Sequence, residues 1–338
     1  MDSLTHIALG ACLGEAFLGK QLGRRAMVWG ALAHSSADID FIAGFWLSPS
    51  EALLAHRGFT HSLLFAAVLS FVYAITADRY HRPHNISMKT WGLFFSVAIF
   101  GHVFIDAFNN YGVGWFEPFS HYRISFNSLY VADPFFSLWP ALALAGLLFF
   151  KSKDRQRRRW LFIGLGLPLL YLGYALCNKA FIIGKVRSLA LQEHIPYTDY
   201  FSTPAPLNNW LWFFVLKADT GYYTGYRSVW DGKKPLTLTY FPQNRHLLDT
   251  VSDHEAVQHL IRFSRNFYTV EQWHDTLVFN NLQFGQMLGW VQPRGHFVFH
   301  FYLSHPNDNR LVVQRGRFEG WNREAFWSLI KRIRGNAP

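Results

Sequence analysis

The chain has 338 residues, of which 50% are hydrophobic, 18% are aromatic and 16% are charged, and its formal net charge is +10. This composition excludes intrinsic disorder and a collagen-like protein. The two cysteines, Cys12 and Cys177, lie far apart in apolar segments, which excludes a disulfide framework and a thiolate metal cluster.

Long apolar segments occupy the first 178 residues. Most have 16 to 22 residues, so as helices they would span roughly 24 to 33 Å, close to the thickness of a bilayer core. The sequence therefore predicts an α-helical integral membrane bundle of about six transmembrane or re-entrant helices, and the first two are the candidates for re-entrant segments. The six segments are Leu4 to Gly19, Ala26 to Leu47, Phe59 to Ala77, Trp91 to Phe108, Val131 to Phe150 and Trp160 to Cys177.

The basic residues between these segments predict an orientation. The first, third and fifth connections carry twelve Lys and Arg residues, whereas the second and fourth carry Arg57 and Arg123 alone. Because short cytoplasmic loops collect basic residues, the N-terminus and everything after Cys177 should face away from the cytoplasm of an inner (plasma) membrane. The positive charge then reflects topology, so we expect membrane lipid as a partner and no nucleic acid.

The chain after about Lys185 changes to a mixed polar and aromatic composition. Leu236 to Phe241, Thr276 to Phe284 and His296 to Leu303 are typical of strands. Ser252 to Glu255 fits a capping box that opens a helix to about Tyr268, and Asn322 to Arg334 is typical of a basic amphipathic helix. These patterns predict two domains, a helical membrane domain over 1–180 and a small extracytoplasmic α+β domain over 185–338, whose protein partner the sequence leaves open.

Histidines and aspartates within the apolar half are the most informative residues. His34 and Asp38, like His102 and Asp106, are four residues apart, a spacing that stacks both side chains on one helix face. The predicted topology places these residues and their neighbours near the outer face of the membrane. The predicted metal ligands are His6, His34, Asp38, Asp40, His56, His61, His102 and Asp106.

Energetics favours a bound cation over unpaired carboxylates. Three aspartates within a membrane cost roughly 10 kcal/mol together, and a structural zinc ion contributes about 10 to 16 kcal/mol in peptides. Taken singly, each residue has an ordinary alternative role as a helix cap or a packing partner. Histidines with carboxylates and no cysteine suit zinc, with manganese second, and two ions that share a carboxylate would use the surplus of ligands.

Two arginines are the predicted catalytic residues. Arg57 lies between two of the predicted ligands, and Arg123 lies on the next outer connection. Both guanidinium groups could hold a phosphate through paired hydrogen bonds. The alternative for Arg57 is a simple ion pair with Asp38 or Asp40.

Several short motifs occur along the first half of the chain. They are Thr5-His6, Asp38-x-Asp40, His56-Arg57-Gly58-Phe59-Thr60-His61-Ser62, His102-x-x-x-Asp106, Asn110-Tyr111-Gly112, Pro118-Phe119-Ser120 and Asp133-Pro134. With these motifs the sequence resembles, over about residues 1 to 178, the YdjM-like family of inner-membrane, metal-dependent hydrolases. The resemblance implies a helical membrane protein with a hydrolase-like metal site, by analogy to zinc phospholipase C and nuclease folds. One position departs from the family pattern: Ala37 stands where the family usually has proline, so the second segment could remain helical, with Asp38 and Asp40 about 200° apart.

The leading hypothesis from the sequence is a membrane-bound, metal-dependent hydrolase that cleaves a phosphoester or ester of a lipid or lipid-linked substrate at the outer leaflet. A bound water would attack, and Arg57 or Arg123 would stabilise the charge of the transition state. The first alternative is an ion-coupled transporter, which needs polar residues that continue to the cytoplasmic face. The second is a non-catalytic membrane scaffold with a structural metal.

Overall fold

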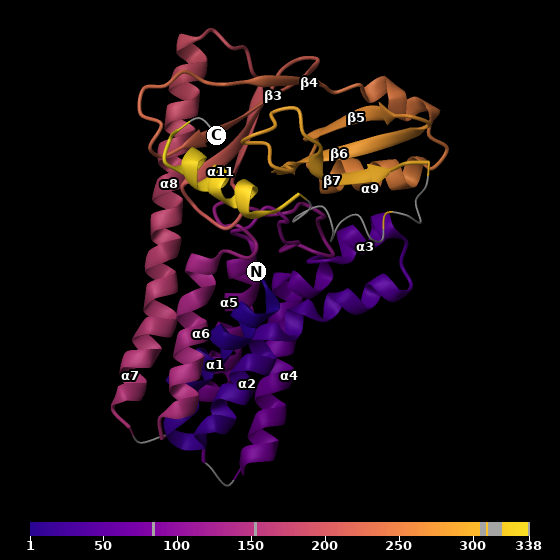
Figure 1. Ribbon diagram of the computed structural model, residues 1–338. Helices are drawn as coiled ribbons and strands as arrows, with labels where there is room; N and C mark the ends of the chain where they lie inside the picture. The colour runs from indigo at the N-terminus through magenta and orange to yellow at the C-terminus, as the bar shows by residue number, and fades with distance from the viewer. Residues whose placement is uncertain (83–84, 152–153, 305–308, 310–319, 337–338) are drawn as a thin grey trace. The chain divides into compact units, whose positions relative to one another are not determined.

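The computed structural model describes residues 1–82, 85–151, 154–304, 309 and 320–336. The chain divides into two compact units. Unit 1 comprises Met1–Phe45 and Ala55–Ala175, and unit 2 comprises Trp46–Leu54 and Leu176–Pro338. Unit 1 is helical, whereas unit 2 contains two antiparallel sheets with flanking helices (Figure 1).

Unit 1 consists of helices joined by short turns and one longer irregular segment. Three helical segments in the described part of the chain are long and apolar enough to cross a membrane: α4, α5 and the continuous stretch Gln156–Gln192. The helices are α1 (Ser3–Leu22), α2 (Arg24–Ser35), η1 (Ser36–Phe45), η2 (Phe59–His61), α4 (Leu63–His81), α5 (Met88–Asp106), α6 (Pro134–Phe149), α7 (Gln156–Leu161), η4 (Phe162–Gly166) and α8 (Leu167–Gln192), of which α8 continues into unit 2.

The expected number of about six spanning helices is therefore not confirmed. Helix α1 has 20 residues but carries His6, Glu15 and Lys20, which lower its mean hydropathy. Helix α6 is apolar but has only 16 residues, fewer than the roughly 20 that a straight crossing needs. The structure supports a helical membrane part with three spans by length and composition.

The second predicted segment is not one continuous α-helix. Helix α2 ends at Ser35, and the chain continues as the 3₁₀-helix η1. The Ser36 hydroxyl donates to the Leu32 carbonyl oxygen at 2.6 Å, and such a bond competes with the backbone ladder and bends a helix. With Ala37 in place of proline the segment thus remains helical, but as a 3₁₀-helix from Ser36, so Asp38 and Asp40 do not lie on a continuous α-helix.

Small residues bring α1 and α2 into close contact. A Cβ atom added at Gly14 would overlap the Ala26 carbonyl oxygen, and one added at Gly30 would overlap the carbonyl oxygen of Gly10. Glycine at such crossings lets helix backbones approach within van der Waals distance. This crossing fixes the positions of the polar residues that the two helices carry.

A buried ion pair joins α1 to α7. The Arg157 guanidinium donates to both carboxylate oxygens of Glu15, at 2.7 and 2.6 Å, and to the carbonyl oxygens of Leu147 and Phe150. Each charge is compensated by a paired geometry, as buried ions require. Glu15 therefore has a structural partner at the end of unit 1 where α6 ends and α7 begins.

Unit 2 contains two sheets with simple antiparallel order. The four-stranded sheet has the order β1-β2-β3-β4 and the three-stranded sheet has the order β5-β6-β7. The strands are β1 (Asp199–Pro204), β2 (Leu211–Lys217), β3 (Gly221–Ser228), β4 (Thr239–Pro242), β5 (Tyr268–Trp273), β6 (Thr276–Gln286) and β7 (Phe297–Tyr302).

Strand β2 shows how this unit is built. Phe213 and Val215 face the core shared by the two sheets, which also contains residues of β6 and β7. Trp212, Phe214 and Leu216 alternate with them and pack against the part of α8 that contains Ile182, Val186 and Ala190. Because successive strand side chains point to opposite faces, a strand buried on both faces is apolar throughout.

The predicted elements of this domain are present with shifted ends. The three predicted strands correspond to β4, β6 and β7. Helix α9 (His254–Phe263) is capped by Asp253 instead of Ser252, and it ends before Arg265 and Asn266, which both have positive φ. Helix α11 (Arg323–Ile333) is capped by Asn322 as expected. The structure adds β1, β2, β3, β5, α3 (Pro49–Ala55) and η5 (Arg245–Thr250).

The helix crossing leads to a stability prediction. Gly14→Ala places a methyl group against the α2 backbone and should lower the free energy of unfolding by about 1 to 3 kcal/mol. The matched control is Gly92→Ala in α5, where the added Cβ meets no atom within 4 Å, so stability should be unchanged or rise by up to about 1 kcal/mol. Unfolding of both variants in detergent-lipid micelles measures the difference, and equal stabilities would contradict the close crossing.

Candidate metal centre

The polar residues of unit 1 gather at one end of its apolar helices. His61 ends η2, directly before α4 begins, and Asp106 is the last residue of α5. Helices α4 and α5 follow one another along the chain and pack together. The start of α4 and the end of α5 therefore lie at the same level (Figure 1). Residue Asp38 of η1 and residue His6 in the first turns of α1 reach the same place.

Four side chains form a compact group of metal-type donors: Asp38, His61, His102 and Asp106. The Nε2 atom of His61 lies 3.7 Å from Asp38 Oδ1 and 3.4 Å from Asp106 Oδ2. The Nε2 atom of His102 lies 3.5 Å and 3.7 Å from the same two oxygens and 3.1 Å from His61 Nε2.

These distances fit one tetrahedral ion. Four nitrogen and oxygen ligands 2.0–2.2 Å from a zinc ion lie roughly 3.3 to 3.6 Å from one another. The Oδ2 atom of Asp106 makes no hydrogen bond among the described residues, although it forms an ion pair with Arg57 Nε at 3.1 Å, and the side chains of His61, His102 and Asp106 are fully buried. The donor set therefore fits a divalent cation, and the Asp38 side chain, which is 24% exposed, is its link to the surface.

Asp40 and His56 lie outside this group of four. Asp40 Oδ2 lies 3.5 Å from Nδ1 of His61, the ring nitrogen opposite the group, and it accepts a hydrogen bond from the Arg57 backbone at 2.6 Å. Burial alone would raise the pKa of Asp40, but the hydrogen bond and charge of His56 at 3.3 Å outweigh burial and lower the pKa. Asp40 thus holds the His61 ring, an arrangement typical of the second layer around a metal.

Arg57 is buried beside the carboxylate of Asp106. Its Nε atom lies 3.1 Å from Asp106 Oδ2, its guanidinium donates to Asn109 Oδ1 at 2.7 Å, and its charge lies 5.2 Å from the Tyr111 ring centre. The backbone of Arg57 has φ 56°, a left-handed conformation that costs energy in a residue other than glycine. The ion pair is with Asp106, whereas the alternative considered from the sequence was a pair with Asp38 or Asp40.

Arg123 contacts the backbone of the same region. Its guanidinium donates to the carbonyl oxygens of His56 at 2.7 Å, of Gly112 at 3.1 Å and of Tyr111 at 3.3 Å. These bonds tie the segment that precedes Arg57 to the segment that follows α5. The contacts are those of a residue that positions a loop.

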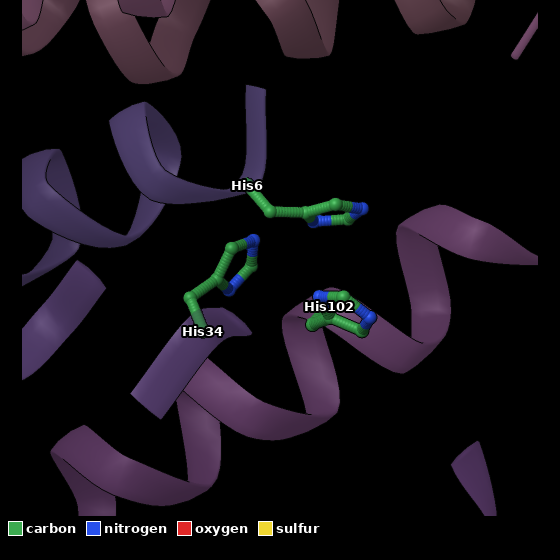
Figure 2. A group of neighbouring side chains, drawn as sticks. All are labelled: His6, His34 and His102. Atoms are coloured by element: carbon green, nitrogen blue, oxygen red, sulfur yellow. The ribbon is translucent and has the colours of Figure 1, made fainter. Parts of the chain in front are cut away.

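A second group of three histidines lies next to the first: His6, His34 and His102. Figure 2 shows the three rings, which come from α1, α2 and α5 and face one another. The ring centres of His6 and His102 lie 3.9 Å apart, and His34 lies 5.3 and 5.5 Å from them. His102 belongs to both groups, so the two groups together contain six of the eight predicted ligands, and the other two adjoin them, Asp40 beside His61 and His56 beside Asp40.

Sequence reasoning missed three groups at this site. They are Asn109, the Ala98 carbonyl oxygen, which binds His34 Nδ1, and the Met1 amino group, which contacts Asp106 Oδ1. Asn109 precedes a motif already singled out, so its neighbourhood offered a signal. A backbone carbonyl oxygen leaves no signal in the sequence, because every residue has one.

Comparisons with known proteins match the part of the chain that contains the site. The profile of the YdjM inner membrane protein family matches residues 1–182, which include both histidine groups. Inner membrane protein YbcI of Escherichia coli (strain K12) is 28% identical over 144 residues, 42% of this chain and 75% of the relative. Protein YfhP of Bacillus subtilis (strain 168), named uncharacterized, is 33% identical over 153 residues, 43% of this chain and 46% of the relative.

The chain thus spans about half the length of YfhP, and no solved structure matches it. Together with the apolar helices of unit 1, the relatives establish a location in the inner membrane. Because the profile covers more than half of the 338 residues, this chain belongs to the YdjM inner membrane protein family.

Proposed function

We propose that the protein is a membrane-bound, metal-dependent hydrolase that cleaves a phosphoester or ester of a lipid or lipid-linked substrate at the outer leaflet. The observation that carries this proposal is the group of two imidazoles and two carboxylates with tetrahedral spacing at one end of the apolar helices. Three of its four side chains are fully buried, and a bound cation would add to the positive charge that Arg57 places beside Asp106.

Zinc fits the donor set best, and manganese is the second choice. Asp38, His61, His102 and Asp106 would hold the ion, which supplies a Lewis acid for a phosphoryl or acyl oxygen. Asp40 keeps the His61 ring oriented, because its carboxylate faces the ring nitrogen away from the group. Substrate and water reach the group from the side of Asp38, whose side chain is part-exposed.

Arg57 supplies positive charge next to the centre. Asn109, the Met1 carbonyl oxygen and the Tyr111 ring fix its guanidinium, so its charge stays beside Asp106 Oδ2 and close to the charge that develops on a substrate oxygen. Arg123, the second predicted catalytic residue, acts in this proposal by positioning the backbone of His56.

Exposed apolar side chains next to the ligands support a lipid substrate. Ile39 and Phe41 flank Asp40 on η1, and Phe59 lies between His56 and His61. Their exposed fractions are 51%, 67% and 49%. Large apolar side chains exposed around a polar centre are typical of a surface that meets lipid.

The distribution of basic residues supports the outer leaflet. Lys and Arg cluster on the connections at the opposite end of the helices, around Arg24 and Arg157, and such clusters remain in the cytoplasm. The metal group and unit 2 then belong to the extracytoplasmic side. An ion-coupled transporter has less support, because Glu15, the buried acidic residue in the cytoplasmic half of α1, is bound to Arg157.

Metal content tests the centre directly. His61→Ala and Asp38→Asn should each abolish binding of one zinc ion per chain, as measured by mass spectrometry after dialysis against zinc. Asp40→Asn should weaken zinc affinity about 10- to 100-fold, the usual effect of a second-layer partner. The matched control is His121→Ala, an exposed histidine paired with Glu117, which should bind as the wild type does.

Unchanged zinc content in both His61→Ala and Asp38→Asn would exclude the centre. A hydrolysis assay on vesicles with phosphoester and acyl-ester lipids then tests the activity, with metal-loaded protein, metal-stripped protein and Asp38→Asn compared. Turnover should require the metal and Asp38. A loaded, folded protein that hydrolyses none of these lipids would favour a non-catalytic scaffold instead.

Topology has its own test. A reporter enzyme that is active only outside the cytoplasm should be active when fused after residue 336 and inactive when fused after Lys151. The reverse pattern would place the metal group at the cytoplasmic leaflet and contradict the proposed orientation.

A further inference from the structure

Hydrogen bonds fix the ring orientations of two histidines of the second group, His6 and His34. His6 Nε2 bonds to the carboxylate of Asp106 at 3.1 Å, and His34 Nδ1 donates to the Ala98 carbonyl oxygen at 2.5 Å. Since a carbonyl oxygen and a carboxylate only accept, these ring nitrogens carry the proton. The opposite nitrogen of each neutral ring therefore presents a lone pair.

Three ring nitrogens of the second group have no partner in the described structure. They are His6 Nδ1, His34 Nε2 and His102 Nδ1, and all three rings are fully buried. Figure 2 shows these nitrogens turned toward the space between the rings, and one donor atom of each ring lies within 4.8 Å of the others. Buried nitrogens without a hydrogen bond are costly, so three in one place indicate a missing electron-pair acceptor.

We propose that His6, His34 and His102 hold a second divalent cation, and that His102 bridges the two ions. His102 Nε2 belongs to the four-donor group, while its Nδ1 faces the three-histidine group. When both nitrogens bind metal, the ring is an imidazolate and its proton passes to solvent. This inference rests on the proposed function, because it extends the same centre from one ion to two.

The donor chemistry distinguishes the two positions. The first position has two carboxylates and two imidazoles, whereas the second has imidazoles only. Three imidazole-type ligands form a set typical of zinc sites with an open position, and here His6 and His34 are neutral with outer partners on their other nitrogens, whereas His102 is the bridging imidazolate. Asp106 connects the positions a second time, because its Oδ1 holds His6 and its Oδ2 faces the first ion position.

Zinc stoichiometry separates the two sites. Wild-type protein should bind two zinc ions per chain, His34→Ala and Asp38→Asn should each bind one, and His121→Ala should bind two. His34→Gln, which keeps a polar side chain beside Ala98, is the second variant in case His34→Ala does not fold, and it should also bind one. Wild-type and His34 variants that all bind a single ion would overturn the proposal and leave the four-donor centre intact.

The reverse result is equally informative. Loss of an ion in the His34 variants with no loss in Asp38→Asn would refute the four-donor centre and, with it, the bridge. The bridge itself is tested with copper(II): two ions joined by an imidazolate couple magnetically, so the electron paramagnetic resonance signal of doubly loaded protein should fall well below that of two isolated ions. A full, uncoupled signal from protein with two bound copper ions would exclude His102 as the bridge.

Discussion

The buried carboxylate of Asp106 is the constraint around which unit 1 is organised. It ends an apolar helix with no exposed surface, where an isolated charge is expensive, so the chain surrounds it with positive and hydrogen-bonding groups. Those groups come from parts of the sequence up to 105 residues away, so several helices must be positioned correctly around Asp106. The surrounding groups are the Met1 amine, His6, Arg57, His61 and His102.

The close crossing of α1 and α2 at their glycines also brings polar side chains together. Gly10 contacts Gly30 one turn from His6 and His34, so the two imidazoles approach because the backbones that carry them can touch. The backbone of Arg57 is also strained in order to place its groups. Its left-handed conformation lets the amide face Asp40 while the side chain reaches Asp106. Precise placement of polar groups thus depends on apolar packing and on backbone conformations that few residues adopt.

The sequence predicted the gathering of ligands better than their individual roles. The spacing of His102 and Asp106 was enough to place them together, because both lie on a regular α-helix. Asp38 and Asp40 were harder, since the switch to a 3₁₀-helix at Ser36 depends on side-chain bonds to Leu32 and Tyr73 that no local pattern encodes. In unit 2, β2 escaped detection because burial on both faces removes the alternation by which a strand is recognised.

The bond between Glu15 and Arg157 sets an order for biosynthesis. The two partners are 142 residues apart, which at 5 to 20 residues per second means that Glu15 waits roughly 7 to 28 seconds for its counter-ion to be translated. Throughout that interval the Glu15 carboxylate lacks the guanidinium that compensates its burial, so the contact of α1 with α7 is completed only after Arg157 has been made. The amino-terminal helix, made first, is therefore among the last to be locked in place.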